Sequence, residues 1–315
     1  MKNLIVDANF PRTLDERVYH LGIKAGEVAN RIVTVGAPSR AERIATYLDP
    51  SPRPFVLNTE RGFLTITGRY KGTPVSIVGA IVVPKASIAV NRNYDFDFVN
   101  DSTEQEDPYK ISKAVQADAE LSTALNATFE RSRKSDVQSQ IVSGTLNAST
   151  DSFYSSQGRI TSFPDHNADI IDKLKAAHSD LATFEMETFH LFHLAASWPT
   201  HKRPSQVATP PISSRPADLT IAEPGLPAHQ AKQAVPPDVS TSAPDGHVLV
   251  PQPRIRAAAA QMVFAARGSR DFITPEQVET LENWTAVAVL DTLVSFEIDS
   301  ERLHAEAGSV WEMKG

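Results

Sequence analysis

The stretch that decides the fold is Ile32–Arg40, which has the sequence IVTVGAPSR. Its β-branched first half predicts a strand, its Gly and Pro predict a turn, and the next residues, Ala41–Leu48, predict a helix. After this strand–loop–helix unit come an alternating segment, Phe63–Tyr70, a turn at Lys71–Thr73 and a second apolar segment, Pro74–Val78. The two segments and their turn predict an antiparallel hairpin.

Strand and helix patterns continue to alternate along the chain. Val75–Val90 is mostly apolar, too long for one ordinary strand, and interrupted by Gly79 and Pro84, which predicts two strands with very few residues between them. A further strand is expected at Gln140–Ser149. Helices are expected at Val115–Arg131, Asp169–Ala177, Thr183–Ser197, Ile255–Ala266 and, after a cap at Thr274, through Phe296. Such alternation predicts an α/β sandwich.

One segment has a different composition. Residues 199–253 hold twelve of the 22 prolines and no Phe, Trp or Tyr. Such a segment buries too little apolar surface to offset the entropy lost on ordering. We therefore predict a proline-rich disordered insertion at 199–253, within a single domain built from residues 1–198 and 254–315.

Composition excludes several classes of function. The chain has 31 Lys and Arg against 38 Asp and Glu, a formal charge of −7, so no global basic field favours nucleic acid as a partner. The lack of cysteine excludes disulfides, zinc–thiolate sites and thiol nucleophiles. No stretch approaches the roughly 20 apolar residues that span a bilayer, and the first ten residues do not resemble a signal peptide. A cytoplasmic protein without membrane partners is expected.

Two patterns are suited to binding a small ligand. Gly36 lies where a strand meets a helix, so backbone N–H groups and the Arg40 guanidinium are placed to hold an anion. A turn with a solvated arginine is the alternative. Ser152–Arg159 (SFYSSQGR) places aromatic rings close to an amide and a guanidinium. These groups recognise the edge of a pyrimidine or purine, and an ordinary polar loop is the alternative.

A third pattern, Phe184–Thr188 (FEMET), places Glu185 and Glu187 at the start of a predicted apolar helix. Carboxylates there need hydrogen-bond donors, which vicinal sugar hydroxyls could supply, or they form a pair that favours the helix dipole. Glu187, His190 and His193 have the spacing of metal ligands, but a second such motif is missing, so we expect partly buried, hydrogen-bonded histidines and no metal. Motifs of serine hydrolases, phosphate-loop NTPases and zinc proteases are also missing.

Five motifs in this order carry a resemblance to a known family: YHLG at 19–22, VGAPSR at 35–40, ERGF at 60–63, FYSSQGR at 153–159 and EME at 185–187. Together they resemble the uridine phosphorylase branch of the nucleoside phosphorylase family. The resemblance implies a three-layer α/β/α sandwich with a mixed central sheet. It also implies a pentosyltransferase that converts uridine and phosphate to uracil and ribose 1-phosphate in pyrimidine salvage, with phosphate as co-substrate and no cofactor.

The resemblance implies a role for each matching residue. It places the phosphate at Gly36, Arg40 and, from a neighbouring subunit, Arg61. It places the nucleoside at His20, also from a neighbouring subunit, and at Phe153, Gln157, Arg159, Glu185, Met186 and Glu187. The catalytic side chains would be Arg40, Arg61 and Arg159, which act by positioning and electrostatics. Active sites shared between subunits imply a homodimer or a larger homo-oligomer.

Two features depart from the family pattern. Val78–Ile81 continues directly into Val82–Val90, which resembles the next family strand, so a few dozen family residues near 78–81 are missing, and with them a second phosphate arginine. Ala37 stands where the family usually has Asp. Besides an active phosphorylase, the sequence therefore leaves open a catalytically impaired nucleoside-binding pseudoenzyme and a nucleosidase that uses water.

Overall fold

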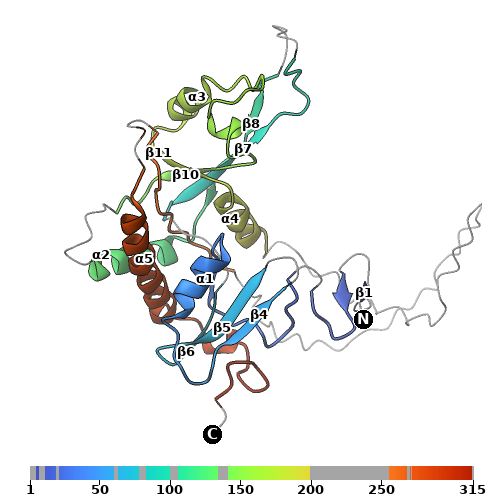
Figure 1. Ribbon diagram of the computed structural model, residues 1–315, viewed down its shortest axis with the longest axis vertical. Coiled ribbons are helices and arrows are strands. Elements are labelled where there is room, and N and C mark those ends of the chain that lie inside the picture. The colour runs from blue at the N-terminus through green and yellow to red at the C-terminus, as the bar shows by residue number, and fades with distance from the viewer. Residues whose placement is uncertain are drawn as a thin grey trace, which may run out of the picture. The chain divides into compact units, whose positions relative to one another are not determined.

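The structure is a computed structural model, and it describes residues 5–6, 11–18, 21–59, 63–77, 83–99, 106–133, 141–198, 255–267, 270 and 272–313 (Figure 1). Met1–Trp198 and Ile255–Gly315 belong to one compact unit. The predicted insertion at 199–253, the junction at 78–82, His20 and Arg61 lie outside the described residues. What was predicted for them stays a prediction.

The predicted hairpin is the centre of a four-stranded sheet with the order β3-β6-β5-β4. Its strands are β3 (Ile32–Val33), β4 (Phe55–Asn58), β5 (Leu64–Tyr70) and β6 (Thr73–Ile77). β5 and β6 pair antiparallel around Lys71 and Gly72, which both have positive φ, 49° and 76°. A two-residue loop with positive φ at both positions matches the twist of the strands. The hairpin prediction is confirmed, and β3 runs parallel to β6.

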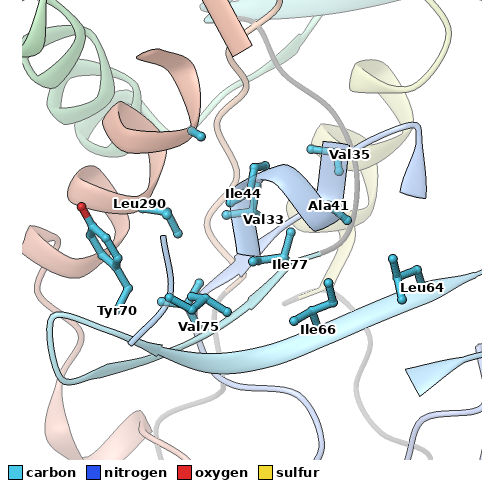
Figure 2. Packing of buried hydrophobic residues seen from close by; sticks show 12 residues of the cluster. Val33, Val35, Ala41, Ile44, Leu64, Ile66, Tyr70, Val75, Ile77 and Leu290 are labelled. Atoms are coloured by element: carbon cyan, nitrogen blue, oxygen red, sulfur yellow. The ribbon is translucent and has the colours of Figure 1, made fainter. Parts of the chain in front are cut away.

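Helices α1 (Pro38–Ala45) and α5 (Pro275–Ser295) cover this sheet with apolar side chains (Figure 2). Ile77 of the sheet, Ile44 of α1 and Leu290 of α5 belong to one buried cluster. α1 begins earlier than predicted because Pro38, whose ring fixes a helical φ, occupies its first turn. α5 begins where predicted, since Thr274 and Gln277 form a capping box.

A second, five-stranded sheet has the order β11-β10-β7-β8, with β9 also paired to β7. β10 is parallel to both β7 and β11, whereas β8 and β9 are antiparallel to β7. Three helices, α2, α3 and α4, belong to this part of the chain. The bounds are β7 (Ala86–Arg92), β8 (Tyr109–Ile111), β9 (Val115–Gln116), α2 (Ala119–Ser132), β10 (Leu146–Thr150), α3 (Ile170–Ala177), β11 (Leu181–Glu185) and α4 (Thr188–Ser197).

The α/β class is thus confirmed, but the described strands form two mixed sheets rather than one central sheet. β6 and β7 follow each other in sequence and lie in different sheets. β6 pairs with β3 and β5, while β7 pairs with β10 on one side and with β8 and β9 on the other. Each of the two strands thus has neighbours on both sides within its own sheet. The remaining elements of the described residues are a short ribbon, β1 (Ile5–Val6) with β2 (Arg12–Thr13), and the 3₁₀ turns η1 (Ser155–Gln157) and η3 (Ser300–Arg302).

α5 links the cores of the two parts. Its Leu290 packs on the four-stranded sheet, whereas Trp284 packs edge-to-face on Phe129 of α2, with ring centroids 5.2 Å apart. The Trp284 indole N–H also donates to Ser132 Oγ at 3.0 Å. Helices α2 and α5 therefore lie side by side (Figure 1). Among the described helices, none is long and apolar enough to cross a membrane.

Several predicted boundaries were wrong. The first part of the predicted helix Thr183–Ser197 belongs to strand β11, and the predicted helix at Val115–Arg131 begins as strand β9. The predicted strand Gln140–Ser149 begins only at Leu146. Ile255–Ala266, predicted as an alanine-rich helix, has no helix, because its buried alanines pack separately: Ala257 with Phe192 and Ala260 with Trp284. Tertiary packing overrides alanine's helix propensity.

Candidate functional site

The ends of two parallel strands bring the candidate residues together. β10 ends at Thr150 and β11 at Glu185, and both strands run in the same direction. The segments that follow them, 152–159 and 185–187, therefore leave the sheet at the same edge, where α/β proteins bind ligands. Thr150 joins the two segments, because its Oγ1 lies 3.2 Å from the Glu185 carbonyl oxygen and 3.1 Å from that of Ser152.

In the 152–159 loop, the predicted residues bond to one another. Gln157 is 3% exposed, and its Nε2 donates to Thr150 Oγ1 at 2.9 Å. The Arg159 guanidinium donates to Gln157 Oε1 and lies 3.8 Å from the centre of the Phe153 ring. Gly158 follows with a φ of 64°, and a Cβ there would lie 2.9 Å from Ile170 Cγ2. The loop thus requires glycine at this position.

Arg267 holds the same loop from outside it, and sequence reasoning missed this residue. Its guanidinium donates to the carbonyl oxygens of Gln157 and Gly158, both at 2.9 Å. Burial, and next the charge of Arg267, lower the pKa of Arg159. More than a hundred residues separate Arg267 from the loop in sequence, so no local spacing could have indicated the contact.

Glu185 has a different environment from the predicted one. It ends a strand instead of beginning a helix, and its Oε1 accepts from Asn147 Nδ2 at 2.6 Å and from Ser149 Oγ. Its Oε2 accepts the backbone N–H groups of Glu187 and Thr188, both at 2.7 Å. The carboxylate therefore caps the start of α4, which agrees with the helix-dipole alternative. Asn147 and Ser149, both buried, were missed because their polar character in a strand carried no motif.

Met186 and Glu187 are exposed at the same edge. A Glu187 carboxylate oxygen accepts the Met186 N–H at 3.1 Å. Although the residue as a whole is exposed, partial desolvation of its carboxylate, followed by the neighbouring Glu185 charge, raises the pKa of Glu187. Since a carboxylate has four lone-pair positions, this one remains able to accept further hydrogen bonds.

The two histidines of α4 do not match the prediction. His190 and His193 are exposed rather than partly buried, and His193 stacks on Phe189 with ring centroids 5.8 Å apart. α4 turns both imidazoles to solvent because its buried side is formed by other residues, Thr188, Phe192 and Ala195. Within the described residues, no group of three or more His, Asp or Glu side chains could hold a metal ion.

The predicted anion-binding residues lie at the start of α1. A Cβ on Gly36 would meet no atom within 4 Å, so the backbone is open to a ligand there. Arg40, however, has a carboxylate partner: its Nε lies 3.1 Å from Glu282 Oε1 of α5. Arg43 Nε lies 3.2 Å from the other oxygen of Glu282. An anion arriving at Arg40 would have to compete with Glu282 for this cation.

A cavity of about 690 Å³ is lined in part by Ser152, Tyr154 and Ser155 of the 152–159 loop. Tyr154 lines it, together with Phe163 and Phe98, whereas Phe153 is not among its lining residues. Arg92 and the buried Asp165 also line the cavity and form an ion pair at 2.5 Å, and the Tyr109 hydroxyl donates to the Asp165 carbonyl oxygen at 2.7 Å. Burial, and next the Asp165 charge, raise the pKa of Tyr109 to about 12. These bonds attach the loop region to β7 and β8.

The range of the chain that holds these residues is similar to known proteins. Residues 78–198 match the phosphorylase superfamily, a range that contains β10, β11 and the 152–159 loop. A uridine phosphorylase from Thermococcus kodakarensis is 26% identical over 220 residues, which cover 62% of this chain and 78% of that protein. A DeoD-type purine nucleoside phosphorylase from Oceanobacillus iheyensis is 43% identical over 81 residues, and the chain spans only 33% of its length.

Two solved structures are also similar. A uridine phosphorylase from the oomycete Phytophthora capsici has a TM-score of 0.68 and 29% identity, and the match covers 94% of this chain and all of that one. A nucleoside phosphorylase from Trypanosoma brucei has a TM-score of 0.60 over 91% of this chain and all of that one, at 15% identity, and supports the fold alone. In sequence and fold, the chain is therefore similar to uridine phosphorylases and, over residues 78–198, to the phosphorylase superfamily.

Proposed function

We propose that the chain catalyses phosphorolysis of uridine to uracil and ribose 1-phosphate. The observation that carries this proposal is the constellation of Phe153, Gln157 and Arg159, which Thr150 joins to the 185–187 segment. An aromatic face, an amide and a guanidinium suit a pyrimidine with carbonyl groups on its edge. The likeness to uridine phosphorylases from two organisms supports the same substrate.

The proposed site has two sides, one that binds the nucleoside and one that binds phosphate. The nucleoside side consists of Phe153, Gln157, Arg159 and segment 185–187, and Thr150 connects the loop to this segment. The phosphate side consists of Gly36 and Arg40, with Arg61 as a proposed contribution from a neighbouring copy. His20 of that copy would belong to the nucleoside side, where it would reach the ribose 5′-hydroxyl. Such sharing would require a homodimer or a larger homo-oligomer. A cytoplasmic location, a part in pyrimidine salvage and independence from cofactors belong to the same proposal.

In the proposed reaction, a phosphate oxygen bonds to the anomeric carbon as the bond from that carbon to the uracil nitrogen breaks. The bonding electrons pass to the uracil ring, where N–H donors of Arg159 and Gln157 stabilise the negative charge. Met186 lines the ribose, and Glu187 accepts hydrogen bonds from its hydroxyl groups. Glu185 acts through Glu187, because its carboxylate holds the Glu187 and Thr188 N–H groups. Positioning and charge stabilisation supply the rate.

A second candidate is a nucleoside-binding pseudoenzyme. The observation that favours it is the ion pair between Arg40 and Glu282, which places a carboxylate where phosphate would bind. A like charge at that place disfavours a dianion. The direct passage from Val78 to Val82 in sequence, where the family has a further phosphate arginine, favours the same candidate.

The purified full chain tests both candidates. The absorbance change from uridine to uracil would be followed with and without phosphate, and uridine binding would be measured by calorimetry. Phosphate-dependent turnover is the expected result. Binding without turnover would instead support the pseudoenzyme, and base release that needs no phosphate would reveal a nucleosidase. A folded chain that neither binds nor converts uridine would contradict both candidates.

A further inference from the structure

The orientation of the Gln157 side-chain amide follows from its neighbours. Arginine has N–H donors and no acceptor, so the Gln157 atom that contacts Arg159 is the oxygen, Oε1. The amide nitrogen, Nε2, then faces Thr150 and donates to its hydroxyl at 2.9 Å. The positions of the amide oxygen and nitrogen therefore depend on one cationic donor and one hydroxyl acceptor.

The Thr150 hydroxyl can accept because its own proton has another destination. Its Oγ1 lies 3.1 Å from the Ser152 carbonyl oxygen and 3.2 Å from the Glu185 carbonyl oxygen. Carbonyl oxygens only accept, so the hydroxyl proton points to one of them. The Gln157 N–H, the Thr150 hydroxyl and a backbone carbonyl thus form a chain of hydrogen bonds with one direction.

Burial makes this direction costly to reverse. Thr150 is 2% exposed and Gln157 is 3% exposed, so water has little access to either polar group. A flipped amide would place its NH₂ against the Arg159 guanidinium and its oxygen against Thr150. Two donors would then face each other, and a buried donor left without a partner lowers stability.

We propose that Thr150 is a positioning residue that makes the nucleoside side select uracil over cytosine. This inference rests on the proposed function. With the amide held in this orientation, Gln157 offers a lone pair on the side of Arg159 and an N–H on the side of Thr150. Uracil has a ring N–H between two carbonyl oxygens, so it donates to Oε1 and accepts from Nε2 and Arg159.

Cytosine has the wrong edge for the same arrangement. Its ring nitrogen N3 carries no proton to donate to Oε1, and its amino group cannot accept from Arg159. A site whose buried polar groups lose their partners rejects the mismatched ligand strongly. If the amide could turn freely, part of this rejection would be lost. Thr150 therefore contributes to selectivity without touching the base.

The test compares Thr150→Val with Thr150→Ser in the full chain, with binding of uridine and of cytidine measured by calorimetry. Val matches the shape of Thr but removes the hydroxyl, whereas Ser keeps it. We expect the preference for uridine over cytidine to fall about tenfold in Thr150→Val and to stay within about twofold of wild type in Thr150→Ser. A variant that merely weakened the fold would lose affinity for both nucleosides alike.

The outcomes separate this inference from the proposed function. Wild type that binds neither nucleoside contradicts the proposed function, and the inference with it. Wild type that prefers uridine, together with a Thr150→Val variant of unchanged preference, overturns the inference and leaves the function standing. Thr150→Ala removes the same hydroxyl without a second methyl group, and it replaces Thr150→Val if that variant does not fold.

Discussion

The nucleoside side and the phosphate side of the proposed site each present an arginine, and the two arginines have different partners. Arg159 contacts an amide oxygen and an aromatic face, which leave its positive charge uncompensated. Arg40 contacts the Glu282 carboxylate, which it shares with Arg43 and which offsets part of its positive charge. The comparison teaches that a motif specifies the type of side chain at a site, while its neighbours determine the charge available to a ligand.

The two sides also differ in how they are built. The nucleoside side is continuous with the five-stranded sheet and lies inside the range that matches the phosphorylase superfamily, 78–198. The phosphate side depends on α1, outside that range, and on α5, which is more than 200 residues away in sequence. Substitutions on the nucleoside side and on the phosphate side should therefore have effects that can be measured separately.

Arg159→Ala tests the nucleoside side with the largest expected effect. Loss of the donor that stabilises the leaving base should lower kcat/KM for uridine by about 10²- to 10³-fold, as removal of a charge-stabilising donor does in other active sites. Steady-state kinetics of uridine phosphorolysis measure this change in kcat/KM. Arg131→Ala, on α2, is the matched control and should leave kcat/KM unchanged. An Arg159→Ala chain with wild-type kcat/KM would contradict the site assignment.

Asp165→Ala tests what holds the loop region beside the nucleoside side. Arg92 would lose its buried partner, so we expect the free energy of unfolding to fall by about 3 kcal/mol. Urea denaturation followed by circular dichroism gives this quantity. Asp95→Ala, which breaks an exposed pair with Lys110, should cause no measurable change. Equal effects from the two variants would show that the Arg92 pair does not stabilise this region.

Glu282→Gln tests the phosphate side with a smaller expected effect. Release of Arg40 from its carboxylate should lower the KM for phosphate about threefold, since a partly exposed ion pair contributes little. Glu279→Gln is the control, because Glu279 bonds to Arg43 rather than to Arg40. Steady-state kinetics at varied phosphate concentration give the KM for phosphate of both variants. An unchanged or increased KM in Glu282→Gln would show that Arg40 does not bind phosphate.

Glu187→Gln should produce the smallest change, visible in the pH dependence of stability. The folded chain holds the Glu187 proton to a higher pH than the unfolded chain does, because its pKa is raised on folding. This group therefore lowers stability as the pH rises through and above the ordinary glutamate pKa. Glu187→Gln lacks this loss, so its melting temperature should equal that of wild type near pH 4 and exceed it by about 1 °C at pH 7. A constant difference across the pH range would contradict the raised pKa.

Local sequence patterns predicted the elements whose stability is local. The alternating segments around Lys71 and Gly72 predicted the hairpin, and Thr274 with Pro275 predicted the start of α5. Both depend on residues within a few positions of one another, through turn geometry and capping. The FYSSQGR motif likewise predicted a loop whose side chains meet, because Phe153, Gln157 and Arg159 are close in sequence.

Tertiary structure decided everything that depends on distant partners. Ile255–Ala266 has the composition of a helix, yet its alanines pack in two separate clusters that no local pattern reveals. Glu185 became a cap because Asn147 and Ser149 lie on the neighbouring strand, and Arg40 gained a carboxylate because α5 packs beside α1. The physical reason is the same in each case: burial makes a polar or charged group take whatever partner the fold brings within hydrogen-bond distance.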